Sequence, residues 1–187
     1  MKRIILASQS PRRRELLGRI IDGFEVMVTH ADESVDGNPP PQEYVMELAL
    51  RKARAISEKD AVVIGSDTVV ALDGEILEKP ESREHARRML KRLSGREHTV
   101  YTGVAIKDAE RELVDFEATR VLFDELSDDI IDRYIATGEP MDKAGAYGIQ
   151  SLGCALVKKV DGDYANVVGL PLFKLIKMLE KFGIDIF

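Results

Sequence analysis

The residues with the clearest potential for chemistry are Gly65-Ser66-Asp67-Thr68, a polar run inside an apolar stretch. β-branched apolar residues flank this run on both sides, and each flank predicts a short buried strand. Because a lone carboxylate is costly to desolvate, we expect Asp67 to face a cleft, where it would meet a metal ion, a water molecule or a cation. The alternative is that Asp67 caps a turn and accepts hydrogen bonds from nearby amides.

A second candidate site lies near the N-terminus, where Ser8 and Ser10 precede Pro11 and three consecutive arginines. Ser10 is a suitable N-cap and Pro11 suits the first helical position, so a helix is predicted to begin there. Arginines in a first turn oppose the helix dipole, and a ligand carrying several negative charges would resolve that conflict. Backbone N–H groups, hydroxyls and guanidinium groups would then converge on the ligand. A solvated basic turn is the alternative.

Charged residues elsewhere in the chain can complete such a site. Glu33 or its neighbour Asp32 offers carboxylate oxygens to a hard cation, although a solvated loop is the alternative for both. Lys79 follows a predicted hairpin and can return a positive charge toward Asp67. Lys52 lies within a helical pattern, which by itself is typical of a surface lysine.

The segment Met141–Gln150 combines small residues with polar side chains that can contact a ligand. Its glycines would let the backbone approach a ligand closely, but glycines also simply make turns. The histidines at 30, 85 and 98 lie outside all of these segments. We interpret each of them as a surface or packing residue.

Hydrophobic periodicity predicts the elements that must position these residues. Ser82 and Ser127 are predicted N-caps of further helices, and Asp73-Gly74 is the signature of a two-residue hairpin. Two of the expected strands, 98–106 and 113–123, would form a long antiparallel ribbon. The other strands are predicted at 4–7, 24–28, 62–64, 69–72, 75–77 and 155–160, and the other helices near 44–56 and 172–179.

Composition limits the classes of function. The 187 residues carry a formal net charge of −6, which argues against a general nucleic-acid-binding surface. Cys154 is the only cysteine, so an intramolecular disulfide and a cysteine-rich zinc site are excluded. We find no signal peptide and no apolar run of membrane-spanning length, so a cytoplasmic protein that binds neither membrane nor nucleic acid is expected.

Taken together, the motifs resemble those of the Maf family of nucleoside triphosphate pyrophosphatases. The resemblance covers nearly the whole chain, and several motifs in the same order make it highly specific. The motifs here are Leu6-Ala7-Ser8-Gln9-Ser10-Pro11-Arg12-Arg13, Gly65-Ser66-Asp67-Thr68-Val69-Val70, Leu77-Glu78-Lys79-Pro80, Leu93-Ser94-Gly95-Arg96 and Asp142-Lys143-Ala144-Gly145-Ala146-Tyr147-Gly148-Ile149-Gln150.

The resemblance implies a fold, an activity and a cofactor. Residues 1–187 would form a single domain of two lobes around a cleft, α/β in class, with an elongated mixed sheet similar to that of inosine triphosphatase. The activity would be hydrolysis of nucleotides between the α and β phosphates, which gives a monophosphate and pyrophosphate. A divalent cation, Mg²⁺ or Mn²⁺, would assist, and the protein would be a homodimer. The alternative that we keep is a non-catalytic nucleotide-binding regulator of cell division.

The resemblance also assigns roles to single residues. Asp67 matches the proton acceptor, and Glu33 matches a second acidic position near the metal, although either carboxylate can be the base and the other a metal ligand. The amide of Gln150 offers a donor and an acceptor side by side, which suits the edge of uracil or thymine. The match to Arg12, Thr68 and Gln150 favours the branch that hydrolyses dTTP and UTP over the branch that acts on 7-methyl-GTP. The phosphate-contacting positions correspond to Ser8, Arg13, Lys52 and Lys79.

Overall fold

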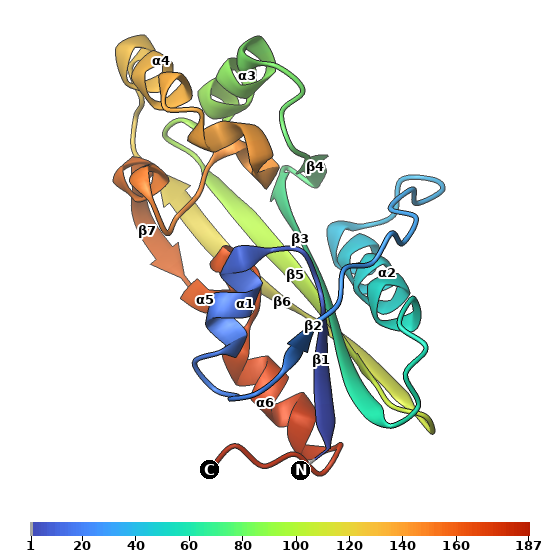
Figure 1. Cartoon of the computed structure of the whole chain (residues 1–187). Coiled ribbons are helices and arrows are strands. Elements are labelled where there is room, and N and C mark those ends of the chain that lie inside the picture. The colour runs from blue at the N-terminus through green and yellow to red at the C-terminus, as the bar shows by residue number, and fades with distance from the viewer. Residues whose placement is uncertain (1) are drawn as a thin grey trace.

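The protein, described for residues 2–187 by a computed structural model, is built on one mixed seven-stranded sheet. Figure 1 shows this sheet running the length of the molecule with helices on both faces, which confirms the predicted α/β class. The strands are β1 (Arg3–Ala7), β2 (Glu25–Val26), β3 (Ala61–Leu72), β4 (Glu75–Leu77), β5 (Glu97–Lys107), β6 (Glu112–Phe123) and β7 (Val157–Asp161). Their order is β2-β1-β3-β5-β6-β7, and β4 pairs with β3.

The helices divide between the two faces of the sheet. Helix α2 (Pro41–Arg54) covers one face alone, at the right in Figure 1. The others lie on the opposite face, where α3 (Arg83–Leu93) and α4 (Asp128–Ala136) gather at one end of the sheet. Helices α1 (Pro11–Leu17), α5 (Tyr164–Val168) and α6 (Leu172–Glu180) lie nearer the other end. Three short 3₁₀ helices span Glu139–Asp142, Ala144–Ala146 and Leu152–Leu156.

Strand β3 sorts its side chains between these two layers. Ala61 and Val63 pack with Ala49 and Ala53 of α2 in a small core. The alternate residues of β3 face the larger core on the other side, among them Val62, Ile64, Val70 and Leu72. This period of two places Asp67 on the α2 face and Thr68 on the opposite face.

The prediction of two short strands separated by a turn at Gly65–Thr68 is wrong. Strand β3 runs unbroken through this segment, because β5 pairs with it antiparallel from Val63 to Ala71, and Asp67 lies opposite Gly103. Small and polar residues mimic turn chemistry here, but the neighbouring strand determines the conformation. Asp67 therefore does not cap a turn, which leaves the cleft interpretation.

The other edge of β3 is interrupted. Strand β1 pairs with β3 only as far as Ala7 opposite Gly65. Strand β4 begins its pairing at Val70 opposite Leu77, as the hairpin signature predicts. Residues 66–69 of β3 therefore have a strand neighbour on one side only. We call this interruption the edge gap. At the edge gap, side chains on both faces of β3 can be reached from the one open edge of the strand.

Two glycines allow α2 to lie directly on the sheet. A Cβ added at Gly65 would lie 2.2 Å from the carbonyl oxygen of Ala49, and one added at Gly103 would lie 2.2 Å from the carbonyl oxygen of Val45. Such a close approach of backbone to backbone is possible only without side chains. It brings the residues of α2 next to Asp67.

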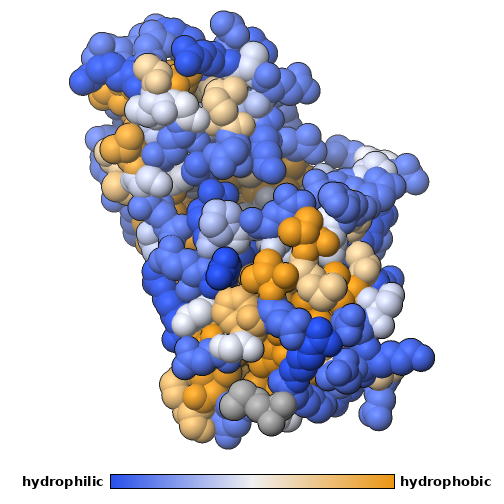
Figure 2. All heavy atoms as spheres, viewed as in Figure 1, coloured by the Kyte–Doolittle hydropathy of each residue, from blue (hydrophilic) through white to orange (hydrophobic). Residues whose placement is uncertain are grey.

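Other predictions of elements are confirmed with small differences. Ser10, Ser82 and Ser127 are N-caps whose hydroxyls accept backbone N–H groups. The predicted strand 24–28 shrinks to Glu25–Val26, and α5 was not predicted. In residues 2–187, no helix combines the length and apolarity needed to cross a membrane. Figure 2 shows a mostly hydrophilic face, with hydrophobic residues gathering in its lower half over β1 and β2.

His98 is a packing residue, as predicted, and its side chain is buried. Its Nε2 lies 2.8 Å from the Tyr147 hydroxyl, and its ring meets the rings of Phe123 and Tyr147 edge-on. Burial disfavours the charged imidazolium and lowers the pKa of His98 to about 4, from 6.5.

This histidine predicts a pH dependence of stability. The unfolded chain binds a proton at His98 below pH 6.5, whereas the folded protein does so only near pH 4. The contribution of His98 to the free energy of unfolding is therefore fully favourable above pH 6.5 and falls by up to about 3 kcal/mol as the pH drops to 4. Urea unfolding at both pH values measures this fall, and a His98→Gln variant should show a smaller one. An equal fall in both proteins would contradict the assignment.

Candidate active site

One large cleft opens at the edge gap, with a volume of about 1130 Å³. Its walls come from both ends of the sheet: the segment after β1, the loop before α2, α2 itself, β3, the segment after β4 and the 142–150 segment. Every predicted site residue lines it, namely Ser8, Arg12, Arg13, Glu33, Lys52, Asp67, Thr68, Lys79 and Gln150. The cleft thus gathers residues that are far apart in the sequence.

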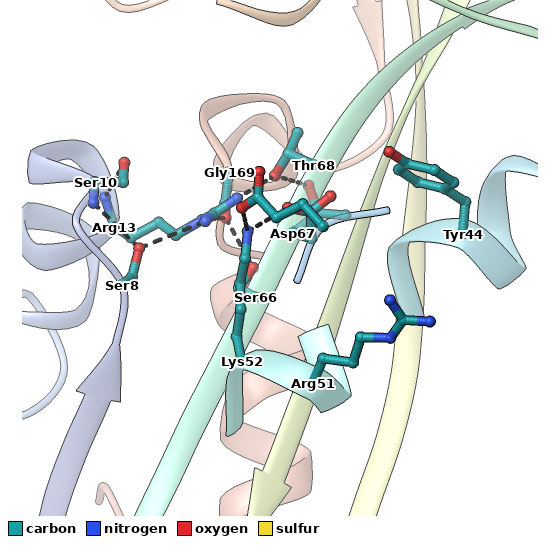
Figure 3. A network of polar contacts seen from close by, with 12 residues as sticks. Ser8, Ser10, Arg13, Tyr44, Arg51, Lys52, Ser66, Asp67, Thr68 and Gly169 are labelled. Atoms are coloured by element: carbon teal, nitrogen blue, oxygen red, sulfur yellow. Dashed lines mark hydrogen bonds and ion pairs between the residues drawn. The ribbon is translucent and has the colours of Figure 1, made fainter. Parts of the chain in front are cut away.

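On the α2 face of β3, a lysine bridges the two predicted acids. Lys52 Nζ donates to Asp67 Oδ1 at 2.7 Å (Figure 3). The same nitrogen lies 2.8 Å from Glu33 Oε1. The side chains of Lys52 and Asp67 are each 13% exposed, whereas that of Glu33 is 64% exposed. The hydrogen bond from Lys52 lowers the pKa of Glu33, and the positive charges of Lys79 and Arg13 lower it further. Lys52 is therefore not the surface lysine that its helical pattern suggests.

On the opposite face, Arg13 is held in place by several acceptors. Its Nε donates to the carbonyl oxygen of Gly169 at 2.8 Å and its Nη2 to the Thr68 hydroxyl at 2.9 Å, while Nη1 lies 3.5 Å from the Ser8 hydroxyl (Figure 3). Loss of surrounding water lowers the pKa of Arg13, and the negative charge of Asp67 opposes that shift. Arg13 therefore presents a fixed positive charge beside the carboxylate.

Asp67 and Thr68 are neighbours in sequence but serve different walls of the cleft. Asp67 bonds Lys52 from α2, and Thr68 bonds Arg13 from α1. The hydroxyl of Thr68 also lies 3.0 Å from that of Thr102. The edge gap lets both walls meet in one cleft, which the sequence alone did not indicate.

The remaining predicted residues have few internal partners. Arg12 Nη1 lies 4.0 Å from Asp142 Oδ2. The side chains of Lys79 and Gln150 line the cleft and make no hydrogen bond or ion pair with any of residues 2–187. They are free to bind a ligand. Arg14, the third of the consecutive arginines, instead lines a shallow hollow outside the cleft.

Sequence reasoning missed some residues of the cleft. Tyr44 of α2 lines it, and its hydroxyl donates to Glu78 Oε1 at 3.3 Å. Burial and the neighbouring carboxylates raise the pKa of Tyr44 to about 12. The predicted helix near 44–56 gave Tyr44 no functional role. His30 also lines the cleft, whereas we expected a surface or packing position.

The residues fit a divalent cation that arrives with its ligand. Among residues 2–187, no three His, Cys, Asp or Glu side chains gather into a metal site. Two carboxylates, Glu33 and Asp67, nevertheless converge on one positive charge, that of Lys52. Mg²⁺ and similar ions are commonly held by one or two carboxylates together with substrate phosphates and water.

The model of a family described as "Maf-like protein" matches residues 3–182. The chain belongs to the Maf family. Two relatives in the family are a dTTP/UTP pyrophosphatase of Symbiobacterium thermophilum, 52% identical over 100% of this chain and 97% of that protein, and one of Pelotomaculum thermopropionicum, 51% identical over 100% of both. Among solved structures, the Staphylococcus aureus Ham1 protein overlaps 65% of this Maf chain and 72% of its own, at 17% identity and a TM-score of 0.45.

Proposed function

We propose that residues 1–187 form one catalytic domain that hydrolyses dTTP, UTP and related or modified pyrimidine nucleotides to the monophosphate and pyrophosphate. One observation carries the proposal: cations from separate segments meet two carboxylates in a single cleft. The names of the related dTTP/UTP pyrophosphatases support the choice of substrate. The family resemblance supports a homodimer, and we place it in the cytoplasm, as the sequence pattern predicts.

The triphosphate group would lie between the two walls of the cleft. Such a group carries about four negative charges, and its hydrolysis needs positioning and charge neutralisation more than covalent chemistry. Arg13 and Lys52 supply fixed positive charges, Ser8 supplies a hydroxyl, and Lys79 is free to fold over the phosphates.

The acids would activate water. A divalent metal ion, held by Glu33 and Asp67, would supply charge neutralisation and polarise the α-phosphate. Asp67 is the less exposed carboxylate and lies on a strand, so we assign it as the general base that accepts the proton of the attacking water. Glu33, on a more exposed loop, would then serve chiefly as a ligand.

Base recognition is assigned to Arg12, Thr68 and Gln150. Gln150 has unused donor and acceptor atoms at the cleft. Thr68 already accepts a hydrogen bond from Arg13, so it contributes by fixing that guanidinium as well as by any contact of its own.

A Gln150→Glu variant should lose activity selectively. A carboxylate has no amide donor for a pyrimidine carbonyl, so kcat/KM for dTTP and UTP should fall about tenfold or more relative to purine triphosphates. A steady-state substrate panel measures this ratio. Gln42→Glu is the matched control, because Gln42 lies on α2 and does not line the cleft. Equal losses for all nucleotides would exclude a role in base recognition.

The activity itself is tested with a panel of standard and modified triphosphates in Mg²⁺ or Mn²⁺. Release of pyrophosphate with pyrimidine nucleotides is the expected result. Release of orthophosphate would indicate a phosphatase, and binding without turnover would indicate a regulator; either would overturn the proposal.

A further inference from the structure

We propose that Glu139 is a positioning residue that sets nucleotide specificity by holding the segment 142–153, which carries Gln150. This inference rests on the proposed function of the cleft. Glu139 lies just beyond α4, after its C-cap Thr137 and Gly138, and begins a 3₁₀ helix. It does not line the cleft, so it acts through the residues that do.

The carboxylate of Glu139 holds the segment on both sides of Gln150. Its Oε1 accepts the Gly153 N–H at 3.0 Å, and its Oε2 accepts the Leu152 N–H at 3.1 Å. Its Oε1 also accepts the Tyr134 hydroxyl at 2.9 Å, and that hydroxyl accepts the Gly148 N–H at 3.1 Å. The backbone before and after Gln150 is therefore tied to one charged group.

The tyrosine in this relay is itself fixed. Tyr134 lies on the buried face of α4, and burial raises the pKa of its hydroxyl, so it stays a donor. The contact around it is close: a Cβ added at Gly153 would lie 2.6 Å from the Tyr134 hydroxyl and 2.6 Å from the Gly148 carbonyl oxygen. The segment can approach α4 this closely only through glycine.

The same network reaches Arg12, another of the three predicted specificity residues. Lys143 Nζ donates to the Glu139 carbonyl oxygen at 2.9 Å and to Asp142 Oδ1 at 2.6 Å. Asp142 is the residue that Arg12 approaches across the cleft. The carboxylate of Glu139 thus holds the backbone around Gln150, and its backbone carbonyl anchors the lysine that pairs with Asp142, the partner of Arg12. Both contacts lead to residues assigned to base recognition, which is why we assign Glu139 to specificity rather than to the chemical step.

The test is a Glu139→Gln variant, which keeps the size of the side chain but replaces one acceptor with an amide donor. We expect KM for dTTP and UTP to rise about tenfold with kcat within about threefold of wild type, because charge-accepting hydrogen bonds are lost without touching the reacting atoms. Tyr134→Phe removes the hydroxyl that links Glu139 to Gly148 but leaves the bonds from Leu152 and Gly153 to Glu139, so it should act in the same direction and less strongly. Glu180→Gln is the control, since Glu180 ends α6 in a surface ion pair with Lys177.

A binding measurement separates this inference from the proposed function. Calorimetric titration uses analogues of dTTP and dGTP with a methylene group between the α and β phosphates. The preference for the dTTP analogue should fall about tenfold in Glu139→Gln. If wild type binds with this preference but turns nothing over, the proposed function fails and the role of Glu139 is still measured. Unchanged preference in both variants, or no preference in wild type, overturns the role of Glu139; should Glu139→Gln unfold, Tyr134→Phe decides.

Discussion

An Asp67→Asn variant should lose about a hundredfold to ten-thousandfold in kcat while remaining folded, because asparagine cannot take a proton from water. Its shape matches that of aspartate, and its carbonyl oxygen can still accept the hydrogen bond from Lys52. Lys52 also keeps Glu33 as a charged partner, so no positive charge is stranded in the cleft. The rate of pyrophosphate release measures the loss in kcat, and a thermal melt measures whether the variant remains folded.

Asp129→Asn is the matched control, and Glu33→Gln distinguishes the roles of the two acids. Asp129 is an exposed acid of α4, and its loss should leave kcat unchanged. Glu33→Gln should raise the metal concentration needed for half-maximal activity more than it lowers kcat at saturating metal. If Glu33→Gln instead cost more in kcat than Asp67→Asn, the base would be Glu33. A melt near that of wild type with more than a tenth of its kcat would contradict any essential role for Asp67.

Gly65→Ala is expected to produce the largest loss of stability. The new methyl carbon would lie 2.2 Å from the Ala49 carbonyl oxygen and 2.7 Å from the Ala53 nitrogen, and both are backbone atoms that no rotamer change can move. Helix α2 must therefore shift away from the sheet, at a cost of about 3 kcal/mol or more in the free energy of unfolding. Urea unfolding measures this loss directly.

The same variant should also impair the site. Helix α2 carries Lys52, so its displacement lengthens the contact with Asp67, and kcat should fall even where the protein remains folded. Gly18→Ala is the control: Gly18 has a helical φ of −64° at the end of α1, and its nearest contact is its own helix at 3.3 Å. If Gly65→Ala and Gly18→Ala had the same stability, the close approach of α2 to the sheet would not require glycine at position 65.

Local sequence signals predicted the local features of the fold. Ser82 and Ser127 cap helices because the hydroxyl bonds an N–H three residues on, an interaction contained within a few residues. Asp73-Gly74 makes the hairpin because both residues adopt positive φ, 53° and 82°. The failure at Gly65–Thr68 has the opposite origin, since pairing with β5, distant in sequence, keeps that segment extended.

The site was predictable in its members but not in its arrangement. The family resemblance identified nine residues that line the cleft but not Tyr44 or His30. Nothing in the order of residues revealed that Lys52 lies between Glu33 and Asp67. Such pairing depends on how α2 crosses the sheet. Glu139 was missed because its contacts are to backbone groups of a segment with irregular structure, which no periodicity describes.

The edge gap also suggests where this scaffold can be redesigned. Its length depends on where β1 ends and where the antiparallel β4 ends, and neither of these short strands supplies the residue that we assign as the base. Lengthening β1 would cover the acid with backbone, whereas shortening β4 would widen the opening for a bulkier substrate. An engineer who wants a new ligand range would therefore edit the two short neighbours and leave the long strand untouched.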